Sequence, residues 1–554
     1  MKYYLLNIGE DERAAQAIAR LLRNGTFEKG GEAAEGGDED VEVAVELASE
    51  YGLPVLPRGG GTSQNGQTVG EALVLDTTRH LNQLLTFDQE GRTASVQPGM
   101  VLDRLNRFLK PYGLFYPVDV STANRATIGG MTGNNSCGAR SIRYGNMVHN
   151  VRSVEALLAD GSKIHFGPSN GRMPTPAIPD QLLKELLDLG KREAGEISNR
   201  FPDLLRRVGG YNIDTLIQKQ PNFGHLLVGS EGTLGFFQRI HLDLQPLPSH
   251  KVLGICHFPS FYSAMDCTQH IVKLNPAAVE LVDRTMIDLA RDIPLFAPTV
   301  VRFVKGEPQA LLLVEFAGAD PDEQLQSLRQ LNELMGDLGF PDAVVEATET
   351  EFQASVWEVR KSGLNIMMSM KSDGKPVSFI EDCAVRLEDL AEYTHRLTEI
   401  FEKHGTSGTF YAHASVGCLH VRPILNMKEE AGATKMRAIV EETLEIVRQY
   451  KGSHSGEHGD GISRSEFHRP MFGDQMVSNF EEIKQLFDPR GLFNPGKIVH
   501  PYKMDDRNLM RYPPGYKPIA VDTQLDWSAW HGFDRATEMC NNNGACRKAH
   551  DGSM

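Results

Sequence analysis

The chain has 554 residues, of which 40% are hydrophobic and 23% are charged, a composition that allows roughly two or three hydrophobic cores. Its formal net charge of -16 opposes contact with nucleic acids and with anionic membrane surfaces. The 7 cysteines are widely spaced, and the sequence contains neither a signal peptide nor an apolar run of about 18 residues. We therefore expect a soluble, cytoplasmic protein that has no disulfide framework and binds no nucleic acid.

The first predicted elements are a helix over residues 41–51, a short strand over 53–56 and a second strand over 72–75. A third strand over 91–100 leads into a helix over 101–109. This alternation indicates mixed α and β structure.

The loop after the first strand contains three adjacent glycines, Gly59, Gly60 and Gly61. Because they lack side chains, their backbone N–H groups can converge on an anion at close range. The loop follows neither the Rossmann pattern nor the pattern of a phosphate-binding P-loop. A glycine triplet alone is equally compatible with a flexible turn.

Two further glycine clusters favour a ligand site. The second cluster spans residues 127–138 and is followed by Arg143-Tyr144-Gly145. The third spans residues 229–235 and follows an apolar segment over 225–228, which we predict to be a strand. Several such clusters indicate a ligand longer than a single phosphate.

The three glycine segments, in this order, resemble the PCMH-type FAD-binding domain of the vanillyl-alcohol oxidase superfamily, which includes the D-lactate and D-2-hydroxyglutarate dehydrogenases. The resemblance implies that the first two segments hold the diphosphate of FAD and that the third runs along its adenosine half. Relatives with covalent flavin have a histidine where this chain has Thr62, so non-covalent FAD is implied.

The same resemblance assigns the cofactor-binding residues. Most come from the three glycine segments, and Asn494 and Lys497 come from a stretch that returns toward the flavin in relatives, although an ordinary helix end is the alternative there. The full set is Arg58, Gly59, Gly60, Gly61, Thr62, Ser63, Asn65, Gly66, Asp119, Ser121, Thr127, Gly129, Gly130, Asn134, Ser136, Gly138, Tyr144, Glu231, Gly232, Gly235, Asn494 and Lys497.

The pattern changes after residue 248, where long amphipathic helices over 321–338 and 387–404 alternate with isolated strands such as 310–316. The predicted fold class is α+β. A two-subdomain FAD-binding domain over 1–248 precedes an α+β substrate- and metal-binding domain over 249–500, which resembles the FAD-linked oxidase C-terminal domain and has an antiparallel sheet. Residues 501–554 are predicted to be a linker and the incomplete start of an iron-sulfur domain.

Two histidines in the second half, His413 and His420, flank a turn of small residues, and Glu457 lies in a glycine-rich loop. Two imidazoles and one carboxylate leave coordination positions open, as expected for a catalytic zinc, although manganese is not excluded by this ligand set. The alternative is that both histidines are hydrogen-bonded structural residues. These segments are similar to the metal and catalytic motifs of D-2-hydroxyglutarate dehydrogenases, in which the histidine after the glutamate is the base. That resemblance implies His458 as the general base.

An acidic substrate also requires cations. The resemblance implies that Arg360 holds a substrate carboxylate, with a surface ion pair as the alternative. Arg422 lies two residues beyond His420 and would share its face of a continuing strand, and Lys375 is a weaker candidate.

The tail segment from Glu538 to Arg547 resembles the opening of an iron-sulfur domain found in larger bacterial relatives. It contains Cys540 and Cys546, whereas a cluster normally requires about four thiolates. We therefore expect no complete cluster in this chain and an electron acceptor that is an iron-sulfur domain or protein. A plain surface loop is the alternative.

The resulting hypothesis is an FAD-dependent oxidoreductase that oxidises a D-2-hydroxy acid, with D-2-hydroxyglutarate as the preferred substrate and D-lactate or glycolate as alternatives. We expect a homo-oligomer. Two other classes remain open from the sequence: a zinc-dependent hydrolase that binds no flavin, and a non-catalytic electron-transfer subunit.

Overall fold

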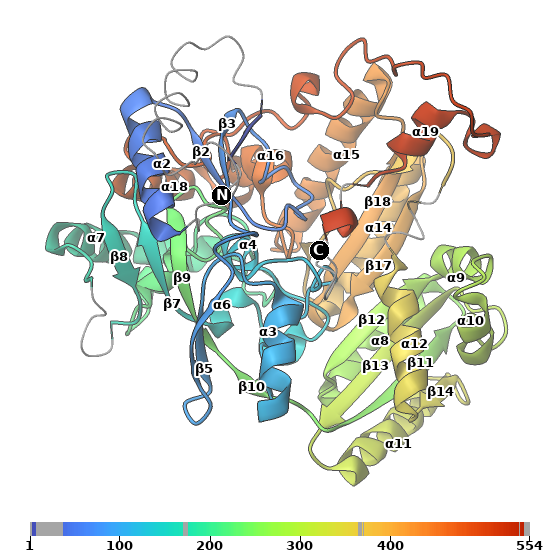
Figure 1. The fold of residues 1–554 in the computed structure, drawn as a ribbon. Coiled ribbons are helices and arrows are strands. Elements are labelled where there is room, and N and C mark those ends of the chain that lie inside the picture. Colours follow the sequence, from blue (N-terminus) through green and yellow to red (C-terminus); the bar gives the residue numbers. More distant parts are fainter. Residues whose placement is uncertain are drawn as a thin grey trace.

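The structure is a computed structural model that describes residues 3–6, 37–169, 176–363, 368, 370–541 and 543–547. The N-terminal half forms two sheets, and the second half forms one large sheet with helices on both faces (Figure 1). The mixture of helices and largely antiparallel sheets confirms the predicted α+β class. In the described part of the chain, no helix is long and apolar enough to cross a membrane.

The first sheet carries the first glycine loop at the end of one of its strands. Its order is β1 (Tyr3–Leu6), β3 (Ala72–Asp76) and β2 (Val55–Arg58), and β2 pairs parallel with β3. Helix α2 (Asp38–Tyr51) buries one apolar face in the same core as these strands. Strand β2 therefore delivers the chain into Gly59–Gly61 from a fixed position.

The second sheet is antiparallel and follows the order β4 (Leu84–Asp88), β5 (Thr93–Val96), β9 (Phe236–Asp243), β7 (Val151–Leu157) and β8 (Lys163–Phe166). Strands β6 (Leu114–Phe115) and β10 (Gln245–Pro246) form a separate pair. The helices of this half are α3 (Leu102–Leu109), α4 (Ile128–Asn134), α5 (Ser141–Tyr144), α6 (Met147–Asn150) and α7 (Asp180–Arg200).

One predicted element of this half is wrong. The apolar segment 225–228 is not a strand, because residues Phe223–Leu226 form a 3-10 helix. The side chain of Asn222 accepts a hydrogen bond from the N–H of Gly224 at 3.0 Å, which caps the first turn of that helix. Local capping therefore overrides the apolar pattern here.

The large sheet is antiparallel throughout. Its order is β14 (Val344–Ala347), β11 (His250–Phe258), β13 (Ala310–Gly318), β12 (Ala278–Asp283), β17 (Gly408–His413), β18 (Cys418–Leu425) and β15 (Lys375–Pro376), and β16 (Cys383–Ala384) also pairs with β18.

Apolar side chains alternate between the two faces of this sheet, as the two-residue period of a strand requires. Cys256 and Leu312 belong to the core on one face, whereas Ile255 and Leu311 belong to the core on the other. One face packs on α8 (Phe261–Ile271), α11 (Pro321–Asp337), α14 (Leu390–Lys403) and α15 (Glu430–Gln449), and the other packs on α9 (Arg284–Arg291), α10 (Ala297–Phe303) and α12 (Thr350–Lys361).

After the large sheet, the chain returns to the N-terminal half. It forms α16 (Gly461–Arg464), α17 (His468–Phe472) and α18 (Asp474–Phe487), and a short helix, α19 (Phe533–Glu538), lies in the tail. Apolar residues of α17 and α18 join the core of the second sheet. Phe493 then bridges to Val55 of β2.

A buried ion pair fixes this return. The carboxylate of Asp488 accepts hydrogen bonds from the N–H groups of Leu492 and Phe493 at 2.9 and 2.7 Å and pairs with Lys484 at 2.6 Å. Lys484 also donates to the carbonyls of Thr233 and Phe493. Both charges are therefore paired within the core that joins the two halves.

Replacing Asp488 with Ala should lower the free energy of unfolding by about 3–5 kcal/mol, because the substitution leaves a buried ammonium without its partner. Urea unfolding followed by circular dichroism measures this. Glu445→Ala is the control, since Glu445 pairs with Arg448 on the surface and its loss should cost less than about 1 kcal/mol. Equal losses in the two variants would contradict the anchoring role.

Candidate active site

The three predicted glycine segments lie together around two adjoining cavities. The two cavities share Thr68 and four of the predicted residues, Gly59, Ser63, Gly130 and Asn134. Of the other residues predicted to bind the cofactor, Arg58, Gly60, Gly61, Thr62, Ser121, Thr127, Gly129, Ser136, Glu231, Gly232 and Gly235 line one cavity or the other. The chain thus brings most of the predicted flavin-binding residues into one region.

Close packing explains the glycines of the first loop. A Cβ atom on Gly59 would overlap the side chain of Thr127, and one on Gly60 would overlap the carbonyl of Arg125. The first and second glycine segments can touch only because these side chains are missing. Backbone N–H groups at this contact are suited to an anionic diphosphate.

The remaining predicted flavin residues lie elsewhere. Asn494 donates to the carbonyls of Gln67 and Glu231, and Lys497 donates to the carbonyl of Val69, so both support the first loop from behind. Five others have different surroundings: Asn65 donates to the carbonyl of Gly459, Gly66 lies against Ile462, Tyr144 packs on Phe115, and Asp119 and Gly138 line a neighbouring cavity.

A buried carboxylate, Glu231, links the flavin region to the loop of Glu457. Glu231 lines the first cavity and has a positive φ of 54°. Its side chain accepts the N–H groups of Asp460 and Gly461 at 2.6 and 2.9 Å. Burial and the neighbouring Asp460 raise the pKa of Glu231.

The predicted metal ligands meet in space. Strand β17 ends at His413, a tight turn follows, and His420 lies on β18, so strand pairing places the two imidazoles side by side. The Nε2 atoms of His413 and His420 lie 2.9 and 3.3 Å from the same carboxylate oxygen of Glu457. The three side chains form one cluster of candidate metal-ligating atoms.

Two further carboxylates orient these imidazoles. Glu280 accepts from Nδ1 of His413 at 2.7 Å, and Glu381 accepts from Nδ1 of His420 at 3.0 Å. When the rings are neutral, both Nε2 atoms therefore carry a lone pair that points toward Glu457 and can coordinate a metal ion. Nε2 of His420 is buried and makes no hydrogen bond to any described residue. This donor set fits a divalent cation.

Electrostatics keep the carboxylates of this cluster ionised. Burial alone would raise the pKa of Glu457, but the neighbouring His413 and His420 hold it well below its usual value. The same opposition acts at Glu381, where Arg422 and the nearby histidines outweigh burial and lower the pKa.

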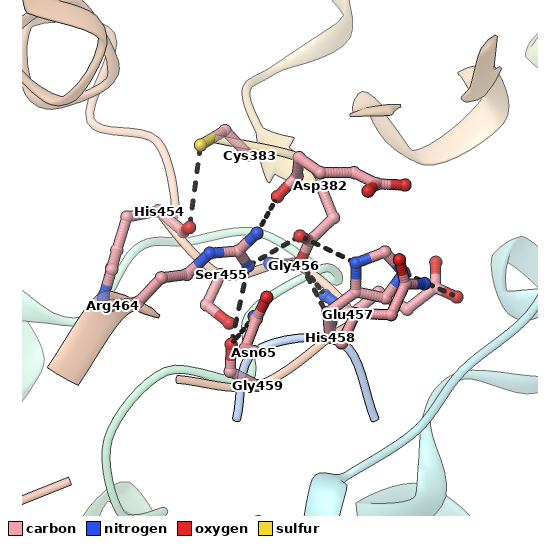
Figure 2. A network of polar contacts seen from close by, with 12 residues as sticks. Asn65, Asp382, Cys383, His454, Ser455, Gly456, Glu457, His458, Gly459 and Arg464 are labelled. Carbon is pink, nitrogen blue, oxygen red and sulfur yellow. Dashed lines mark hydrogen bonds and ion pairs between the residues drawn. The ribbon is translucent and has the colours of Figure 1, made fainter. Parts of the chain in front are cut away.

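The loop of the predicted base is built around Asp382. One carboxylate oxygen of Asp382 accepts the N–H groups of Gly456, Glu457 and His458 at 2.9, 2.7 and 3.0 Å. The other lies 2.6 Å from Arg464 and 3.3 Å from Nδ1 of His458. Figure 2 shows this arrangement, in which Asp382 lies between Arg464 and the loop.

A cavity of about 360 Å³ opens beside the cluster. His413, His420, Glu457 and His458 line it, together with the predicted substrate residue Arg360. Several of its lining residues also line the second flavin-region cavity: Gln64, Val120, Ser121, Glu457 and His458. The group of His413, His420 and Glu457 and the glycine loops therefore lie on either side of shared lining residues.

Arg360 is positioned by its neighbours. Its guanidinium pairs with Glu280 at 2.6 Å and lies over the ring of Tyr411, 4.8 Å from the centroid. Nε of Arg360 is buried and has no hydrogen-bond partner among the described residues. The side chain thus retains donor capacity beside the cavity.

Arg422 and Lys375 do not line the cavity of Arg360, although the guanidinium groups of Arg422 and Arg360 both lie near the ring of Tyr411. Arg422 makes a bidentate pair with Glu381, at 2.6 and 2.7 Å, and contacts Gln64 at 2.8 Å. Lys375 donates to the carbonyl of Met370. Both residues line another cavity of about 430 Å³. It shares the lining residue Gln64 with the cavity of Arg360 and His458.

The C-terminal tail lies beside the first glycine loop. The carbonyl of Asn543 accepts from Arg125 at 2.7 Å, and Gly544 lies against Gly60 and Thr62. The nearby Cys540 and Cys546 are both exposed.

Sequence reasoning missed the supporting residues of the site. Glu280, Glu381, Asp382, Arg206 and Arg464 are all buried and contact the ligands or the loop of the base. The adjacent acids Glu381 and Asp382 were visible in the sequence, but nothing local distinguishes them from surface acids. Their roles depend on strand pairing and on contacts distant in sequence.

Comparison with known proteins agrees with this geometry. Residues 36–167 match the family described as FAD binding domain, and residues 247–498 match FAD linked oxidases, C-terminal domain. D-2-hydroxyglutarate dehydrogenase from Pantoea ananatis is 31% identical over 530 residues, which cover 92% of this chain and 51% of that protein. D-lactate dehydrogenase from Archaeoglobus fulgidus is 29% identical over 464 residues, which cover 83% of this chain and 89% of that protein.

A solved structure shares the fold. The 4-ethylphenol oxidase from Gulosibacter chungangensis superposes with a TM-score of 0.61 at 15% identity, over 90% of this chain and 99% of that one. The present chain spans about half the length of the D-2-hydroxyglutarate dehydrogenases that it matches. The two matched models show that the chain contains an FAD-binding domain followed by an FAD-linked oxidase C-terminal domain.

Proposed function

We propose that the protein oxidises a D-2-hydroxy acid, with D-2-hydroxyglutarate as the preferred substrate, using non-covalent FAD and a divalent metal ion. The observation that carries this proposal is the shared wall between the glycine-loop cavities and the cavity of His413, His420, Glu457 and His458. Bound there, FAD would accept a hydride from the substrate carbon. The names of the relatives favour a 2-hydroxy acid as the substrate.

Substrate binding rests on charge. A metal held by His413, His420 and Glu457, zinc or manganese, would polarise the 2-hydroxyl group and bind the adjacent carboxylate. Arg360 lines the same cavity and supplies a guanidinium for a carboxylate. Arg422 and Lys375 lie beyond Gln64, and they serve a second carboxylate if the substrate extends into that adjoining cavity.

His458 is the proposed general base. Its Nδ1 faces the carboxylate of Asp382 at 3.3 Å, which leaves Nε2 to accept the hydroxyl proton. The ionised Asp382 stabilises the imidazolium that forms, in the way that an aspartate supports a catalytic histidine in hydrolases.

The electron acceptor is proposed to approach at the C-terminal tail. This segment resembles the start of an iron-sulfur domain, and it lies against Gly60 and Thr62 of the first glycine loop. The exposed Cys540 and Cys546 would contribute part of a thiolate ligand set, with the remainder supplied by another segment or polypeptide.

The purified protein should be yellow, and D-2-hydroxyglutarate should bleach it without oxygen. Gly59→Val should lose the flavin absorbance, because a side chain there overlaps Thr127 beside both cavities. Gly336→Val is the control, since its surroundings are open. The visible absorbance of bound flavin measures the flavin content of the wild-type protein and of both variants. A colourless wild-type protein would rule out the proposed function, and equal flavin content in the two variants would contradict the placement.

His458→Gln should reduce turnover by about 10²–10⁴-fold while flavin content is retained, because the hydroxyl proton loses its acceptor. His395→Gln on the surface should leave turnover unchanged. Steady-state rates with an artificial acceptor measure both variants. Unchanged turnover in His458→Gln would contradict its role as the general base, whereas no turnover in the wild-type protein would favour a non-catalytic electron-transfer subunit.

Removing an orienting carboxylate should weaken metal-dependent turnover without removing a ligand. Glu280→Gln is expected to lower activity by about 10–100-fold, as is typical when the carboxylate behind a metal-bound histidine is lost. Added zinc or manganese should recover part of that activity. Activity that is low and insensitive to added metal would contradict the orienting role.

A further inference from the structure

A second group of ligand-type side chains lies outside the active site. It consists of His454, Asp460 and His468, each at most 2% exposed. His454 and Asp460 bracket the loop that carries Glu457 and His458, and His468 begins α17. The ligand-type atoms of these three side chains all lie within 4.8 Å of one another.

The inward atoms of this group have unmet bonding capacity. Nε2 of His468 lies 3.0 Å from one carboxylate oxygen of Asp460, and Nε2 of His454 lies 3.6 Å from the other. Both Nε2 atoms and Oδ1 of Asp460 are buried without a hydrogen-bond partner among the described residues. Buried polar atoms are normally satisfied, so three such atoms directed at one point call for a shared partner.

The tautomers favour a cation as that partner. Nδ1 of His468 lies 2.9 Å from the carbonyl of Ile498 and donates to it, so a neutral ring directs the Nε2 lone pair at the Asp460 carboxylate. A single proton on His468 would satisfy only one of the two rings, whereas a metal ion can satisfy both.

The backbone of Gly209 packs directly against this group. A Cβ atom there would lie 2.8 Å from Cε1 of His454 and 3.2 Å from Oδ1 of Asp460, so a larger residue would displace these side chains. The second oxygen of Asp460 accepts the N–H of Gly210 at 2.7 Å, which fixes the carboxylate.

We propose that His454, Asp460 and His468 bind a second divalent metal ion, distinct from the one at the active site. Two imidazoles and a carboxylate are a ligand set that suits zinc. The spacings of 3.0 and 3.6 Å compare with 2.9 and 3.3 Å at the active-site cluster.

The ion would have a structural role. Through Asp460 it would fasten the end of the 454–460 loop to α17 and to Gly210 of the N-terminal half. Because the backbone of Asp460 also donates to Glu231, the same ion would support the wall of the flavin cavity. It would thereby hold Glu457 and His458 at the interface between the two halves.

Metal counting by mass spectrometry on the zinc-loaded full chain tests this proposal. The double variant His413→Ala/His420→Ala should retain about one ion per chain. His454→Leu, which keeps an apolar volume beside Phe472, should lose about one ion relative to wild type. His395→Leu on the surface is the matched control and should lose none.

Cobalt added to the zinc-free double variant should give visible absorption bands, and zinc should raise its melting temperature. The proposal fails if that variant binds no metal, or if His454→Leu keeps the wild-type count. If His454→Leu does not fold, the double variant decides alone. Metal retained in full by the double variant but lost in His454→Leu would overturn the active-site metal and leave this second site standing.

Discussion

The carboxylate of Asp382 is the group on which the geometry of the active site most depends. One of its oxygens accepts three consecutive N–H groups, and the other meets Arg464 and His458. Burial would raise its pKa, but these contacts outweigh burial and lower it, so the group remains ionised. Because the same atom holds the backbone of Glu457 and His458, ligand and base keep one relative position.

Charge is balanced pairwise around this loop. Four of the buried acids have an arginine partner: Arg206 pairs with Glu457, Arg360 with Glu280, Arg422 with Glu381 and Arg464 with Asp382. With these pairs formed, an added divalent cation gives the site a positive excess. A dianionic hydroxy acid would neutralise that excess, which agrees with the proposed substrate class.

The two halves of the molecule are tied together by chain that returns from the second half to the first. Helices α17 and α18 pack in the N-terminal core, and the residues after α18 pair with β2. The loop carrying His458 precedes this return, while Asn65 of the first glycine loop donates to Gly459 from the opposite side. The proposed base is thus fixed relative to both the large sheet and the flavin region (Figure 2).

The sequence by itself determined the α+β class and located the glycine segments, because glycine punctuation is legible locally. It also predicted His413, His420, Glu457 and His458 as ligands and base, and the structure brings these side chains to one cavity. It predicted a strand at 225–228, where capping by Asn222 makes a helical turn instead. Only the tertiary structure decided that Glu280, Glu381 and Asp382 support the site and that Arg422 and Arg360 line different cavities. Those roles arise from strand register and from contacts between residues far apart in the chain, which no local pattern encodes.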